Sequence, residues 1–297
     1  MSRASIRSIA CTVTIATAVA TLGLAAQVSP NVSDVLARVG GRIAEYYKRA
    51  QKVICTEKYS VQPIGWNFTP EGFARVTESE LRVEAEEGDD SGPGEAKVLR
   101  NVRKVNGRTP REKDKKDRSG CTDLNPLSSE PLAFLLPAHR AEYQFTAAGI
   151  GKGRDAHTLL IDFTLAAPSR KVELIEDKSG HDDCFDWSGR LPAKGRVWVD
   201  AASYDVLRVE QRTPGPVDVR VPVALQRRHN LADPVIVERE EFTIRYKAVA
   251  FRNPDEVMLL PESIVMMIVV RGGLQSTRRS QTFTDYRRFV TEGRLVR

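Results

Sequence analysis

A helical spacing of apolar residues marks the first predicted element. Between residues 32 and 52 the apolar positions are Val32, Val35, Val39, Ile43 and Tyr46. This stripe predicts a helix with one apolar face, and Asn31 or Ser33 can cap its start. Gly40 and Gly41 weaken the helix, but they can also let another backbone approach closely.

A second helix is expected over residues 128–143. Two serines at its start can act as caps, and Pro131 would lie in its first turn. Pro137 is expected to bend or end this helix, because proline cannot donate the backbone hydrogen bond that a helix interior needs. The apolar residues Leu135 and Leu136 lie just before that proline.

Most of the remaining sequence shows the alternation of a β-strand. The predicted strands are 53–63, 73–87, 95–108, a hairpin over 143–167 that turns through the glycines at 149–153, a hairpin over 195–212, and further strands over 242–248 and 257–289. In the hairpin over 195–212, Val197 and Val199 alternate with charged or polar residues, and Leu207 and Val209 resume the pattern after the turn. One face is therefore apolar and the other mostly charged, as in an antiparallel sheet with one wet side.

These elements predict an α+β fold in a single domain. About ten strands and two or three helices fit one large, strongly curved antiparallel sheet whose apolar face packs on the helices. No linker rich in proline, serine and glycine separates two cores, so residues 27–297 are expected to form one domain.

The first 26 residues have the composition of a secretory signal peptide. Arg3 and Arg7 precede an apolar run, and small residues around Ala26 offer a cleavage site. The alternative is an uncleaved membrane anchor, since the run approaches the roughly 20 residues that span a bilayer. Removal of the signal lowers the net charge from +6 to +4, because it contains two basic and no acidic residues. We therefore expect a soluble, monomeric protein in the periplasm or outside the cell.

Three cysteines remain after cleavage, and export to an oxidising compartment favours a disulfide. We expect Cys121 to pair with Cys184, because both lie in polar, turn-rich segments. Cys55 follows an apolar helix and is expected to be buried as a free thiol.

Catalytic and metal-binding patterns are weak throughout. His181, Asp182, Asp183 and Cys184 are consecutive, so in an extended chain they point to opposite sides and rarely share one ion. No Gly-x-Ser-x-Gly elbow is present, and the glycines at 149–153 fit a turn better than a phosphate loop. Basic residues alternate with acidic ones and do not surround aromatics, which disfavours nucleic acid. We expect no catalytic site, metal or cofactor.

A family resemblance emerges from the later strands. The phrases "GRVWVDAASYDVLRVEQR", "LLPESIVMMIVVRGG" and "QTFTDYRRF" resemble the periplasmic lipoprotein-carrier superfamily of LolA, LolB and RseB-like proteins. The likeness covers the last hundred residues better than the first hundred. It implies an incomplete β-barrel wrapped around helices, with an apolar cavity that can take an acyl chain. No position matches the functional arginine of that family or an exposed apolar membrane-insertion loop.

The resemblance therefore implies a non-enzymatic, exported protein that binds a lipid or the acyl chain of a lipoprotein. Candidate cavity residues are Leu135, Leu136, Val197, Val199, Leu207, Val209, Phe242, Ile244 and Ile268. The same side chains would equally build a filled core. Trp198 could stack on Arg208 across the hairpin, either as a simple cover or as a ligand contact.

Two other functions stay open at this stage. One is an envelope sensor or interaction module that binds a protein partner through the polar loops at 107–120 and 226–234. The other, less favoured, is an exported hydrolase that would depend on His181 or His229.

Overall fold

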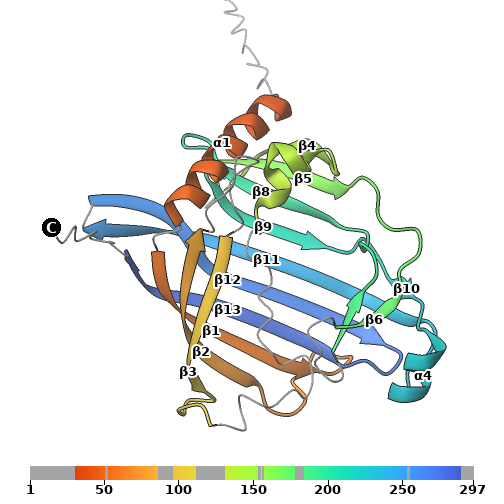
Figure 1. Cartoon of the computed structure of the whole chain (residues 1–297). Coiled ribbons are helices and arrows are strands. Elements are labelled where there is room, and N and C mark those ends of the chain that lie inside the picture. Colours follow the sequence, from red (N-terminus) through yellow and green to blue (C-terminus); the bar gives the residue numbers. More distant parts are fainter. Residues whose placement is uncertain are drawn as a thin grey trace, which may run out of the picture.

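A computed structural model describes residues 31–50, 53–85, 96–111, 131–152, 155, 157–177, 184–252 and 255–288. Within these ranges the chain forms one large, curved antiparallel sheet that carries helix α1 on one face (Figure 1). The expected signal peptide, the metal-like stretch at 181–183 and most of the polar loop at 107–120 lie outside the described residues.

The main sheet has 11 strands in the order β3-β2-β1-β13-β12-β11-β9-β8-β5-β4, with β10 paired to β11. Their bounds are β1 Val53–Ile64, β2 Arg75–Ala85, β3 Ala96–Val105, β4 Tyr143–Ile150, β5 Thr158–Leu165, β8 Lys194–Asp200, β9 Val206–Arg212, β10 Val217–Val219, β11 Val235–Arg252, β12 Asp255–Arg271 and β13 Ser276–Arg288. The sheet is open, because β3 and β4 are its two edges. The prediction of a curved, incomplete barrel is confirmed.

Helix α1 (Val32–Ala50) forms where the apolar stripe predicted it. Asn31 is its cap, since its side-chain oxygen accepts a hydrogen bond from the backbone N–H of Ser33 at 3.0 Å. Val35, Leu36, Val39 and Ile43 form its buried face.

The prediction of a second long helix over 128–143 is wrong. In the described part of that segment, a 3-10 turn η1 (Ala133–Leu135) and a single helical turn α3 (Pro137–Arg140) replace it. Leu136 between them is extended, with ψ of 150°. The residue before a proline is pushed out of the helical region, so Pro137 starts a new turn instead of continuing the old one.

Side chains on the inner face, the face that carries α1, form successive rows across the strands. One row joins Ile161, Val197, Val209 and Ile244, all of them buried. The neighbouring row joins Phe163 to Gly195, Gln211 and Phe242. Glycine is required there, because a Cβ on Gly195 would lie 2.5 Å from the ring of Phe163.

The alternation predicted for the 195–212 hairpin is wrong at one position. Trp198 pairs with Arg208, but Val199 pairs with Val206, so β9 has a bulge at Leu207. A bulge adds one residue to its strand, so the alternation of faces is broken at that point. Val206 is therefore buried in the core, while Leu207 is only partly buried and lies outside the core clusters.

A second, smaller apolar cluster lies at the far end of β11. It is built from a two-stranded sheet of β6 (Leu174–Glu176) and β7 (Phe185–Trp187), helix α4 (Val223–His229), β10 and the start of β11. Leu174, Val219, Val235 and Val237 are fully buried in it. Ile268, a candidate cavity residue, packs against this smaller cluster and not against the cluster of α1.

Candidate functional site

The apolar inner face beneath α1 is the first candidate site. Seven of the nine predicted cavity residues belong to the α1 cluster or pack against it: Leu135, Leu136, Val197, Val199, Val209, Phe242 and Ile244. The gap between α1 and the sheet, beside Ile43 and Tyr246, has a volume of only about 20 Å³. Such a space holds about one water molecule. Beside these two residues, the space between α1 and the sheet is too small for an acyl chain while α1 stays in place.

Polar contacts fasten one edge of α1 to the turn between β8 and β9. Arg42 forms a bidentate ion pair with Asp205, at 3.0 and 3.3 Å. Arg38 donates to the hydroxyl of Tyr204 at 3.0 Å and lies over its ring. Asp200 shapes this turn by accepting the backbone N–H groups of Ala202 and Ser203, which lowers the pKa of its carboxyl.

A further contact ties α1 to the segment around η1 and α3. The guanidinium of Arg140 donates to the carbonyl of Leu36 in α1 at 2.8 Å and to the carbonyl of Leu135 at 3.0 Å. Burial lowers the pKa of Arg140. Gly40 makes the approach possible, because a Cβ there would stand 2.8 Å from Nη2 of Arg140. We call this contact the Arg140 clasp.

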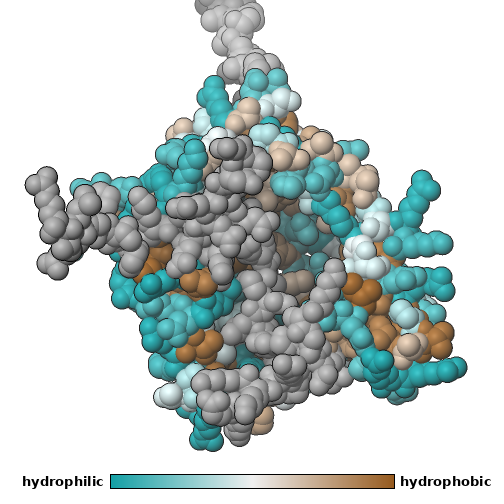
Figure 2. Space-filling model, in the orientation of Figure 1, coloured by the Kyte–Doolittle hydropathy of each residue, from teal (hydrophilic) through white to brown (hydrophobic). Residues whose placement is uncertain are grey.

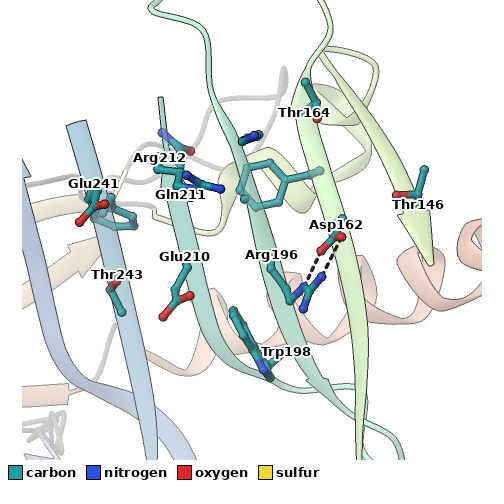
Figure 3. Close-up of a pocket in the computed structure, with 14 residues that line it drawn as sticks. Thr146, Asp162, Thr164, Arg196, Trp198, Glu210, Gln211, Arg212, Glu241 and Thr243 are labelled. Atoms are coloured by element: carbon teal, nitrogen blue, oxygen red, sulfur yellow. Dashed lines mark hydrogen bonds and ion pairs between the residues drawn. The ribbon is translucent and has the colours of Figure 1, made fainter. Parts of the chain in front are cut away.

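The outer face of the sheet has a large hollow of about 710 Å³ (Figure 3). Its polar walls come from β4, β5, β8, β9 and β11. Asp162 and Arg196 form a bidentate pair across two strands, at 2.5 and 2.9 Å. This groove offers hydrogen bonds to a polar group, and Phe163, Trp198 and Phe242 add apolar surface to its lining.

Trp198 lies in this outer groove, on the charged side of its hairpin as expected. The guanidinium of Arg208 stands 4.4 Å from the centre of its ring and also pairs with Glu210. The predicted stacking contact is therefore present. A role of Trp198 and Arg208 in ligand contact stays a prediction.

Sequence analysis missed an exposed aromatic loop between β1 and β2. Trp66 is 83% exposed, Phe68 49% and Phe73 99%. Phe73 was expected to begin a strand, but β2 starts at Arg75. The available signal was the density of aromatics within the ten residues 65–74, bracketed by glycine and proline.

The aromatic loop 65–73 has its own hydrogen bonds. The backbone N–H groups of Gly65 and Phe68 donate to carbonyls within the loop at 2.9 Å, and that of Thr69 donates to the side chain of Asn67 at 3.2 Å. Phe68 also lies under the guanidinium of Arg239, 5.3 Å away. Three backbone N–H groups of this loop are thus paired within it. In the view of Figure 2 most of the described surface is hydrophilic, with apolar patches between.

On the side formed by β1, β2 and β13, the inner face is no longer purely apolar, because it contains a buried ion pair. The carboxylate of Glu57 is 1% exposed and accepts from Arg100 at 2.7 and 3.1 Å and from Gln281 at 2.9 Å. Cys55, on the same face of β1, is a free buried thiol as expected. Burial raises its pKa to about 12, which makes it a poor nucleophile.

The remaining predictions about bound groups concern cysteines and metals. Cys184 is disulfide-bonded, whereas Cys121 lies outside the described residues, so their pairing stays a prediction. Within the described ranges no group of three or more histidine, cysteine or acidic side chains is placed to hold a metal ion. Among the same residues, no helix combines the length and apolar character needed to cross a bilayer.

Comparison with known proteins gives two similar solved structures. One is a domain from Vibrio parahaemolyticus whose name refers to outer membrane lipoprotein sorting; it shares 14% identity and a TM-score of 0.38 and covers 86% of this chain and 94% of its own. The other is a LolA superfamily protein from Nitrosomonas europaea, with 11% identity, a TM-score of 0.30, and coverage of 84% and 93%. No protein-family model and no curated sequence matches the chain.

Proposed function

We propose that this chain is an exported, non-enzymatic protein that binds the acyl chain of a lipid or lipoprotein on the inner face of its sheet. The proposal rests on the way in which that face is covered. Among the described residues, the amphipathic helix α1 and the segment around Leu135 pack on the rows that contain Val197, Val199 and Ile244. Polar contacts hold that helix at its rim.

The hydrophobic free energy gained by burying the apolar face of α1 is comparable to that gained by burying an acyl chain. Four buried side chains, Val35, Leu36, Val39 and Ile43, contribute roughly 6–12 kcal/mol at about 1.5–3 kcal/mol each. A chain of about 15 methylene groups gains about 12 kcal/mol at about 0.8 kcal/mol per group. Exchange of α1 for an acyl chain therefore keeps the rows covered at little net hydrophobic cost.

The rim contacts are suited to such an exchange. The Arg42 and Asp205 side chains remain 38% and 29% exposed. Ion pairs that water can reach contribute about 0–1 kcal/mol each. Apolar burial and the Arg140 clasp therefore decide whether α1 stays seated.

The aromatic loop 65–73 gives this carrier a means to meet its source of lipid. Tryptophan and phenylalanine rings favour the boundary between lipid and water. Unpaired backbone polar groups make entry into that boundary costly, and the loop pairs the N–H groups of Gly65, Phe68 and Thr69 internally. We expect the loop to touch the membrane while α1 opens.

The test is to purify the protein from cells without detergent and to identify bound lipid by mass spectrometry. The proposal predicts an acyl species that co-purifies and is lost when Val199 is replaced by aspartate on the inner face. Thr243→Asp, on the outer face, is the matched control and should retain the lipid. A stable protein partner without any lipid would instead favour the interaction module.

A further inference from the structure

A small polar pocket lies where the sheet of β6 and β7 meets the main sheet. Its volume is about 220 Å³. Glu240 of β11, Thr213 after β9 and Trp187 of β7 line it, together with Tyr143 and Arg190. Glu240 and Thr213 are fixed there by reciprocal contacts, since the N–H of Thr213 donates to the Glu240 carbonyl at 3.0 Å and the Glu240 N–H to the Thr213 hydroxyl at 3.2 Å.

Glu240 supplies a carboxylate without a cation. Among the described residues no lysine, arginine or histidine forms an ion pair with it. Its carboxyl accepts a hydrogen bond from the side chain of Trp187, and burial together with the nearby charge of Asp186 raises its pKa. An acceptor held in a partly dry site with unused lone pairs calls for a donor from outside.

The pocket also contains a positive charge, on Arg190, and this charge already has an acidic partner. The guanidinium of Arg190 pairs with Glu142, donates to the hydroxyl of Tyr143 at 2.7 Å, and lies over the Tyr143 ring. With Arg190 neutralised by Glu142, the lining as a whole favours a cationic guest. The indole of Trp187 adds an aromatic surface of the kind that attracts ammonium groups.

The pocket borders the apolar rows of the inner face. Tyr143 forms its wall and also packs edge-on against Phe163, with ring centres 5.9 Å apart. Gln211 lines the pocket and belongs to the row of Phe163, Gly195 and Phe242. A molecule with its head in the pocket would therefore direct a tail onto these rows.

We infer that this pocket binds the ammonium head group of an amphiphile, with Glu240 as its hydrogen-bond acceptor and counter-ion. The inference rests on the proposed acyl-binding function and narrows its ligands to amphiphiles that carry an amine. Charge-assisted hydrogen bonds of this kind change affinity roughly ten- to hundredfold.

The experiment compares ligands that share one tail and differ in the head. Dodecylamine, dodecan-1-ol and laurate are titrated into the full-length protein at neutral pH by calorimetry, the two charged ligands below their critical micelle concentrations and the alcohol below its solubility limit. We expect dodecylamine to bind at least about tenfold more tightly than dodecan-1-ol, and laurate to bind most weakly. Glu240→Gln should remove this preference. Glu241→Gln, whose side chain faces the outer groove and pairs with Arg239, should keep it.

The outcomes separate the two proposals. Equal affinity for the three heads in the wild-type protein, or an unchanged amine preference in Glu240→Gln, would overturn the head-group site and leave acyl binding intact. Binding of none of the three would overturn the acyl-binding function itself. An unfolding midpoint no lower than that of the wild type confirms that each variant is folded.

Discussion

Gly40 and Gly41 are neighbours in α1 with opposite surroundings, and exchanging each for alanine tests how the helix is held. A Cβ on Gly41 meets no atom within 4 Å, whereas a Cβ on Gly40 comes within 2.8 Å of Arg140 Nη2. Alanine is preferred over glycine inside a helix by about 0.5–1 kcal/mol. We therefore expect Gly41→Ala to increase the free energy of unfolding by about that amount.

Gly40→Ala should instead lower the free energy of unfolding. It brings the same helical gain, but it moves the Arg140 guanidinium away from the carbonyls of Leu36 and Leu135, at 2.8 and 3.0 Å. Each hydrogen bond from a charged donor contributes about 1.5–3 kcal/mol, and renewed hydration of the guanidinium returns part of this. The free energy of unfolding of Gly40→Ala should therefore be lower than that of the wild type by about 1 kcal/mol or more.

The assay is urea unfolding of the two single variants, of Arg140→Ala, and of Gly40→Ala combined with Arg140→Ala. Without the arginine, Gly40→Ala should become stabilising, and the cycle should give a coupling of about 1.5–3 kcal/mol. The reasoning is refuted if Gly40→Ala stabilises the wild-type protein as much as Gly41→Ala does, because the Arg140 clasp would then not hold α1.

Four further predictions concern other parts of the molecule. Arg100→Ala should lower the free energy of unfolding by about 3–5 kcal/mol, because it leaves a buried carboxylate uncompensated; urea unfolding measures this, and a loss below about 1 kcal/mol would contradict the buried pair. The Cys55 thiol, with its pKa raised to about 12, should resist a thiol reagent at pH 8 until urea unfolds the protein, and rapid labelling of the native state would disprove this. Replacing the three aromatics of the loop 65–73 by serine should reduce flotation with anionic vesicles while the unfolding midpoint stays constant. Unchanged flotation would show that the loop does not contact the membrane. Glu240→Gln should stabilise the protein at pH 7 and have no effect near pH 3, because burial raises the carboxyl pKa in the folded state and disfavours only the ionised form. An unfolding curve of the variant that matches that of the wild type at pH 7 as well as at pH 3 would contradict this prediction.

The strand pattern and α1 could be predicted from the sequence because their periodicity is local. Val197 and Val199 alternate with Arg196, Trp198 and Asp200, and that alternation fixes which face of β8 is buried. The stripe from Val35 to Ile43 likewise gives the apolar face of α1. In both cases one short-range spacing determines burial.

The errors arise where a single residue changes the geometry. The bulge at Leu207 is set by the pairing with β8, and the two consecutive apolar residues Val206 and Leu207 do not reveal which of them faces the core. Pro137 divides the expected second helix at Leu136, through a steric effect on the preceding residue. Ile268 has the right character for a core but faces the smaller cluster, because β12 is long enough to contribute to three apolar clusters.

The candidate sites depend on distant pairings that a spacing cannot reveal. The clasp joins Arg140 to Leu36 across 104 positions, and Glu57 meets Gln281 across 224. Neither contact belongs to a motif. The polar pocket around Glu240 arises only because the small sheet of β6 and β7 folds against β11.

The central claim is that α1 and an acyl chain compete for the same rows of the inner face. Amide hydrogen exchange of the full-length protein, with and without a saturating dodecyl amphiphile, tests this competition most directly. The account predicts faster exchange of the α1 amides over residues 35–50 in the bound protein, with no acceleration in β8 and β9. Saturable binding that leaves α1 exchange unchanged, or slows it, would place the ligand elsewhere and contradict the account.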